Sequence, residues 1–102
     1  MDVAELDRIA SALTGVTRKS SGGLAQWRYK GRLLARQLDA THVVIRTDFA
    51  PRRQLMTRYP GTFHVPARYE RHMMVVADIE SGDDGAIEDA VMAAWALQAG
   101  HG

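Results

Sequence analysis

The sequence predicts an α+β fold of two layers, in which a five-stranded antiparallel sheet packs against helices in the order α-β-β-β-α-β-β-α. Two observations predict it. Apolar residues recur at helical spacing near both ends of the chain and at a spacing of two between residues 24 and 47. The predicted strands also come in consecutive runs of three and two, so the chain lacks the regular alternation of strands and helices that a parallel sheet requires.

The length and composition predict one domain over residues 1–102. A chain of 102 residues with 46% hydrophobic residues can fill a core without crosslinks. It contains no cysteine, which excludes disulfides, thiolate nucleophiles and cysteine metal sites. No apolar run approaches the roughly 18 residues of a membrane helix, and the N-terminus lacks the basic start of a signal peptide. We therefore expect a cytoplasmic protein without membrane contact.

The first helix is predicted to begin after Asp2, a capping residue with Glu5 three positions on, and to end at Gly15. Residues 18–23, basic and then Ser-Ser-Gly-Gly, have the composition of an exposed loop or a poorly paired strand. A hairpin follows over residues 24–38, with its break at Gly31.

Two registers of this hairpin are possible. A two-residue turn at Lys30-Gly31 places Trp27 on the same face as Arg32 and Arg36. A three-residue loop sets Arg28 opposite Arg32 and leaves the aromatic side chains in an apolar face. We favour the second register because burying aromatic rings beside arginines costs more. It predicts a buried Trp27 and an exposed Arg28.

The remaining elements are predicted from apolar runs and helix-start signals. The run Val43-Val44-Ile45 indicates a strand buried on both faces. Asp48 and Pro51 indicate the start of a helix, and Asp83 or Asp84 can cap the last one. The predicted ranges are a strand over residues 42–47, a helix from 48 to about 59, strands over 62–65 and 72–79, and a helix ending near residue 100.

Basic residues are concentrated in the middle of the chain. Between Arg18 and Arg71, twelve Lys or Arg stand against three acids, a net charge of +9, whereas the remaining segments have one Arg against nine acids, a net charge of −8. Eleven of the thirteen basic residues are arginines, whose guanidinium groups bind phosphate bidentately and stack on bases. The alternative is that these side chains only cover apolar strand edges with their stems. The candidate nucleic-acid-binding residues are Arg28, Lys30, Arg32, Arg36, Arg52, Arg53, Arg58, Arg68 and Arg71.

No motif indicates catalysis, a metal or a cofactor. No serine lies in a nucleophile elbow, and the glycines at 22–23 lack the end of a phosphate loop. The acidic residues 78–84 lack the spacing of an EF-hand. The histidines also lack metal-ligand spacing; they are His42, His64, His72 and His101. We therefore expect a protein that is not an enzyme and needs no cofactor.

Several segments resemble the MmcQ/YjbR family of small bacterial proteins. The resemblance rests on the runs 27–36 (Trp-Arg-Tyr-Lys-Gly-Arg-Leu-Leu-Ala-Arg), 43–46, 59–66 (Tyr-Pro-Gly-Thr-Phe-His-Val-Pro), 69–72 and Ala94-Trp95. It implies the element order given above, an architecture related to CyaY (frataxin) and to secretion chaperones, and DNA binding through a double-wing arrangement. Met74 and Asp78 depart from the family, where many members have tryptophan and a basic residue.

These features predict a DNA-binding protein without enzymatic activity, whose segment 18–71 contacts phosphates with low sequence specificity. The alternative is a protein-interaction or chaperone-like module, or a homodimer, in which the arginines maintain solubility. One contiguous basic face favours nucleic acid, whereas basic residues mixed with acids favour a protein partner. The acids in question are Asp78, Glu80, Asp83 and Asp84.

Overall fold

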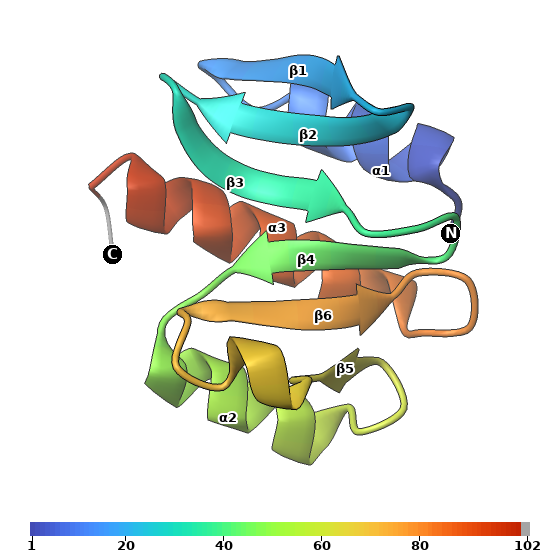
Figure 1. The fold of residues 1–102 in the computed structure, drawn as a ribbon. Helices are drawn as coiled ribbons and strands as arrows, with labels where there is room; N and C mark the ends of the chain where they lie inside the picture. Colours follow the sequence, from blue (N-terminus) through green and yellow to red (C-terminus); the bar gives the residue numbers. More distant parts are fainter. Residues whose placement is uncertain (101–102) are drawn as a thin grey trace.

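The computed structural model describes residues 1–100, which form an open antiparallel sheet of six strands and three α-helices (Figure 1). His101 and Gly102 lie outside the described residues. The elements are α1 (Val3–Ser11), β1 (Val16–Ser21), β2 (Leu24–Tyr29), β3 (Arg32–Gln37), β4 (His42–Arg46), α2 (Phe49–Arg58), β5 (Phe63–His64), the short 3-10 helix η1 (Ala67–Tyr69), β6 (Met74–Asp78) and α3 (Asp84–Gln98).

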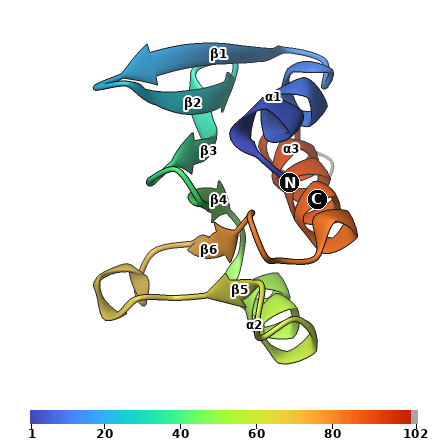
Figure 2. The ribbon, with the colours of Figure 1, turned by 90° about the vertical axis from the view of Figure 1, so that its right-hand side faces the viewer.

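The strand order across the sheet is β1-β2-β3-β4-β6-β5. Helices α1 and α3 cover one face, and α2 lies beside β5 on the same side (Figure 2). The loop that carries η1 lies on the opposite side of the sheet. The predicted α+β class is therefore confirmed, but the sheet has one strand more than the five predicted. None of the helices in residues 1–100 is long and apolar enough to cross a membrane.

The additional strand is β1, which includes most of the segment expected as a loop or a poorly paired strand. It pairs with β2 residue by residue, from Val16 opposite Tyr29 to Ser21 opposite Leu24. Gly22 and Gly23 have φ angles of +58° and +80°, the conformation that a tight two-residue hairpin turn requires. Every residue of β1 except Val16 is exposed, so the strand has no apolar alternation to reveal it.

The hairpin of β2 and β3 has the two-residue turn of the first register, but its strands are not paired throughout as either register predicts. Lys30 and Gly31 form a two-residue turn with φ angles of +47° and +83°, and Tyr29 pairs with Arg32. A bulge next to Trp27 then shifts the pairing so that Trp27 lies opposite Ala35. The preference for a three-residue loop was wrong, whereas the expected burial of Trp27 is confirmed at 0% exposure. Arg28 is half-buried rather than exposed.

The core lies between the sheet and helices α1 and α3. One row of paired residues crosses its centre on the helix-covered face, from Trp27 through Ala35 and Ile45 to Val75. These side chains are at most 1% exposed, and Leu6 of α1 and Ile87 of α3 pack against them. Burial of this apolar surface is the main source of the stability of the fold.

All three α-helices begin directly after a predicted capping residue, and in two of them the side chain of that residue makes a capping hydrogen bond. Asp2 accepts a hydrogen bond from the Glu5 amide, and Asp83 accepts one from the Ala86 amide at 2.8 Å. Asp48 is the N-cap residue of α2, so the predicted helix start is confirmed, but its side chain makes no capping hydrogen bond. Helix α2 buries no residue completely and is the most loosely packed of the three helices.

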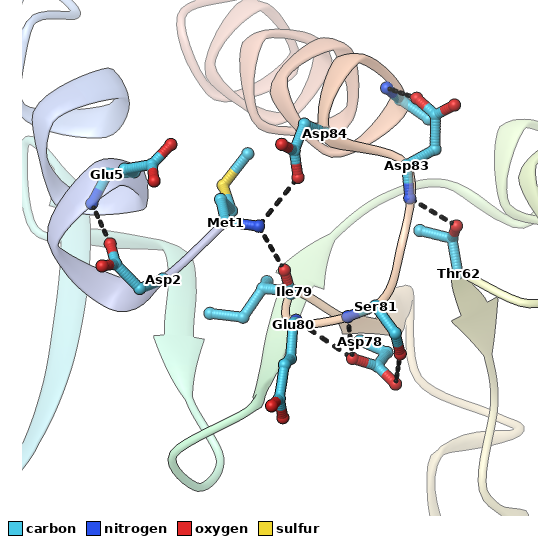
Figure 3. A network of polar contacts seen from close by, with 11 residues as sticks. Met1, Asp2, Glu5, Thr62, Asp78, Ile79, Glu80, Ser81, Asp83 and Asp84 are labelled. Carbon is cyan, nitrogen blue, oxygen red and sulfur yellow. Dashed lines mark hydrogen bonds and ion pairs between the residues drawn. The ribbon is translucent and has the colours of Figure 1, made fainter.

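The N-terminal ammonium group connects the start of the chain to the turn before α3 (Figure 3). It donates to the Ile79 carbonyl at 2.6 Å and to Asp84 Oδ1 at 2.8 Å. The hydrogen bond with Asp84 raises the pKa of this ammonium group, against the opposing effect of burial. The turn itself is closed by Asp78, which accepts hydrogen bonds from Glu80 and Ser81.

Candidate nucleic-acid interface

The candidate site lies on the sheet face opposite α1 and α3, which we call the open face (Figure 2). Side chains alternate between the two faces of a strand, so residues next to the core positions belong to the open face. Pairing across the sheet aligns them in one transverse row. In strand order, this row is Lys19, Gln26, Arg36, Val44, Val76 and His64.

Arg28 lies beside this row on β2 and is held by neutral acceptors. Its Nε and Nη2 atoms donate to Gln26 Oε1 at 3.3 and 3.2 Å, and its Nη1 donates to the Gly31 carbonyl at 3.0 Å. None of these partners is a carboxylate. The side chain is therefore oriented, and within residues 1–100 it forms no ion pair.

Arg36 and Arg68 converge on Tyr69 of η1. Arg36 Nη2 donates to Tyr69 Oη at 2.8 Å, and the Arg68 guanidinium lies 4.8 Å from the centre of the ring. Burial acts to raise the pKa of the Tyr69 hydroxyl, but the hydrogen bond from Arg36 and the charge of Arg68 outweigh it, and the pKa is lowered. The η1 loop thus brings a second arginine to the open face.

Arg52 makes backbone contacts that the sequence did not predict. From α2 it donates to four backbone carbonyls of the η1 loop, at distances between 2.8 and 3.4 Å. Its guanidinium also lies 4.8 Å from the centre of the Phe49 ring. These donors hold the loop against the helix, so they are already engaged. The accepting carbonyls belong to Tyr69, Glu70, His72 and Met74.

The other predicted site residues are dispersed. Lys30 and Arg32 lie at the exposed tip of the β2-β3 hairpin, where Lys30 is 5.4 Å from the centre of the Tyr29 ring. Arg53 and Arg58 are exposed on α2, on the helix side of the sheet. Arg71 is exposed after η1. The structure therefore brings together Arg28, Arg36 and Arg68, but separates them from the pair on α2.

Lys19 is a member of the basic group that the sequence analysis missed. It pairs with Gln26, which in turn pairs with Arg36, so it lies in the transverse row. The sequence does not single it out because residues 18–23 have the composition of an exposed loop or a poorly paired strand. The signal that could have found it is the Gly22-Gly23 pair, which is typical of a two-residue hairpin turn.

Acidic residues occupy another part of the open face. Asp78 pairs with His42 across β6 and β4, and His42 Nδ1 lies 3.0 Å from Asp39 Oδ1. Hydrogen bonds from Ser81, the backbone amide first, lower the pKa of Asp78. The basic residues of the open face lie mainly on β1, β2, β3 and η1. Arg46, at the end of β4, donates to the Thr47 and Met73 carbonyls. Asp83 and Asp84 lie at the start of α3, in the helix layer.

A shallow groove lies between α2 and α3. It has a volume of about 240 Å³ and is lined mainly by apolar groups, with the exposed Arg58 and Asp89 among its lining residues. Among the described residues, no group of three His, Asp or Glu side chains is placed to hold a metal ion. The groove contains no nucleophile paired with a base, so it supports no particular reaction.

No family model matches the chain, and no curated protein or solved structure matches it significantly. The resemblance to the MmcQ/YjbR family stays a prediction.

Proposed function

We propose that this chain is a non-enzymatic nucleic-acid-binding protein and that phosphates are contacted by the basic part of the open face. The contacting residues are Lys19, Arg28, Arg36 and Arg68. The observation that carries the proposal is the transverse row itself, because pairing aligns Lys19, Gln26 and Arg36 on a face that neither α1 nor α3 covers. No acid belongs to the row.

The dimensions of this surface suit a polyanion. Neighbouring strands lie about 4.8 Å apart, so Lys19 on β1 and Arg36 on β3 are separated by roughly 10 Å. Duplex DNA carries one charge per about 1.7 Å of its axis, so several phosphates fall within that span. The guanidinium group of Arg28 is fixed in direction by Gln26, which reduces the conformational entropy lost on binding.

Low sequence specificity follows from the position of the helices. Direct reading of bases requires a helix or strand ribbon in the major groove. Helices α1 and α3 lie on the other face, and their first turns carry acids, Glu5 and Asp84. The negative charges of these acids would repel phosphates. The nucleic acid therefore contacts the sheet, and its affinity does not depend on its base sequence.

An apolar protein-docking face receives less support. The large apolar side chains that remain exposed are Leu24, Phe49, Met73 and Met92, at 36 to 47% exposure. They come from four different elements, which are β2, α2, the η1 loop and α3. A contiguous apolar patch is what marks such a site.

Fluorescence anisotropy with a labelled DNA duplex of about 20 base pairs tests the proposal. Affinity should fall steeply between low and physiological salt because each neutralised phosphate releases counterion. Arg28→Ala should weaken binding on every sequence and reduce the salt slope by about one. The matched control is Arg8→Ala, which removes one exposed arginine from α1 in the helix layer.

Three outcomes would contradict the proposal. They are absence of binding at low salt, binding that is indifferent to salt, and equal losses for Arg28→Ala and Arg8→Ala. The last result would mean that only net charge matters and that the open face is not the interface.

A further inference from the structure

The outer edge of β1 is a second surface without a partner in this fold. Strand β1 ends the sheet on one side, and all of its residues except Val16 are exposed. It has no proline and pairs with β2 without a bulge. The opposite edge is formed by β5, which has only two residues. A long regular edge of this kind is a template for another extended strand.

The hydrogen bonds of the β1-β2 pair identify which backbone groups face outward. Ser21 and Leu24 flank the two-residue turn, and Lys30 N donates to the Gly15 carbonyl. Hydrogen-bonded positions alternate along an antiparallel pair, so Thr17, Lys19 and Ser21 direct their N–H and C=O groups toward β2. The intervening residues, Arg18 and Ser20, therefore direct theirs to the free edge.

The hydrogen bond of Val16 is consistent with this alternation. Like Arg18 and Ser20, Val16 directs its backbone groups away from β2, and its amide donates to the Leu13 carbonyl. The amides and carbonyls of Arg18 and Ser20 are thus the groups available to an added strand.

The side chains next to this edge are positively charged on both faces of the sheet. Arg18 points to the helix side, where it forms an ion pair with Asp7 at 3.1 Å. Lys19 lies on the open face. A second copy of the chain that paired along the whole strand would place these basic residues near their own equivalents, which is unfavourable. An acidic strand would be attracted instead.

The geometry points to the edge of β1 as the docking site of an extended acidic peptide segment that joins the sheet as a seventh strand. Its backbone pairs with Arg18 and Ser20, and its carboxylates lie beside Lys19. Backbone pairing supplies the binding energy, and the charge of β1 selects the partner. This inference does not depend on nucleic-acid binding.

The test uses the full chain, labelled with ¹⁵N, and the peptide acetyl-Thr-Glu-Thr-Glu-Thr-Glu-Thr-Glu-amide. Saturating peptide should slow amide hydrogen exchange at Arg18 and Ser20, whose N–H groups point outward, and leave Thr17 unchanged. A peptide N-methylated at alternate residues has the same charge but cannot pair with the edge. It should bind about thirtyfold more weakly, since two or so backbone hydrogen bonds, together about 2 kcal/mol, are lost.

Variants of β1 give an independent test. Ser20→Pro removes an outward amide without removing a hydrogen bond to β2, so the fold is kept while peptide affinity falls about tenfold. Ser20→Ala is the matched control and should bind normally. Lys19→Glu should also lose affinity because its charge then repels the peptide.

Several results would overturn the inference. Equal binding of the methylated and unmethylated peptides would mean that charge alone attracts them. Exchange protection elsewhere, without a change at Arg18 and Ser20, would place the peptide on another surface. Slow exchange at these two amides without peptide, together with a dimer in sedimentation, would show that a second copy occupies the edge.

Discussion

The indole Nε1 of Trp27 donates a 2.8 Å hydrogen bond to the Asp7 carboxylate of α1. Trp27 is the largest fully buried side chain, and a buried indole N–H needs an acceptor. Asp7 also accepts hydrogen bonds from Ser11 and Arg18. This one carboxylate therefore joins α1 to both strands of the first hairpin.

Asp7→Ala should destabilise the fold by about 1–3 kcal/mol because it leaves the buried indole N–H without a partner. The measurement is urea unfolding monitored by tryptophan fluorescence. Glu5→Ala is the control, since it removes another acid from α1 whose side chain accepts none of these bonds. Equal midpoints for Asp7→Ala and the original chain would show that the Trp27 bond contributes nothing.

The stability that Asp7 provides should depend on pH. The hydrogen bond from Trp27, followed by those from Ser11 and Arg18, lowers the pKa of Asp7 despite partial burial. A carboxylate with a lowered folded-state pKa stabilises the fold above its unfolded value, about 3.9, and this contribution is lost as the pH falls through the folded value. The difference in unfolding free energy between the original chain and Asp7→Asn should therefore shrink below about pH 4. A difference that stays constant from pH 7 to pH 3 would contradict this linkage.

Gly15→Ala should be strongly destabilising. Gly15 has a φ of +80°, and a Cβ atom there would lie 2.7 Å from Cε2 of Tyr29. The left-handed conformation alone costs roughly 1–2 kcal/mol for a residue with a side chain, and the contact adds to it. Gly61→Ala is the matched control, because nothing lies within 4 Å of its added Cβ. Thermal unfolding should show a lower Tm for the first variant only, and similar Tm values would refute the argument.

The parts of the fold that the sequence could predict are those with a regular apolar pattern. Val43, Val44 and Ile45 are at most 1% exposed, as expected for a strand buried on both faces. Ile87 and Val91 of the last predicted helix are also buried. Burial leaves a periodic signal in the sequence, and these elements are the ones that carry it.

The bulge and the first strand left no such signal. Leu34 and Ala35 are adjacent, apolar and both buried, so the sequence could not indicate which of them the bulge leaves without a partner on β2. The hydrogen bonds of Arg52 could not be predicted either. Its partners are backbone carbonyls, which every residue has, so the amino-acid sequence does not mark them. The predicted hairpin over residues 24–38 already placed Arg28 and Arg36 near each other. The position of Lys19 beside them could be found only once β1 was known to pair with β2.

Alanine variants of Arg52 and Arg53 should differ in their effect on stability, because only the side chain of Arg52 is hydrogen-bonded to the η1 loop. Arg52→Ala removes donors to four carbonyls of the η1 loop, so we expect a loss of about 1–3 kcal/mol in the free energy of unfolding. Amide exchange should also accelerate in residues 69–74, because the loop is no longer tied to α2. Arg53→Ala, its exposed neighbour, should change the unfolding free energy by less than about 0.5 kcal/mol. Unchanged exchange in the loop of Arg52→Ala, or equal destabilisation by both variants, would show that the hydrogen bonds of Arg52 do not hold the loop in place.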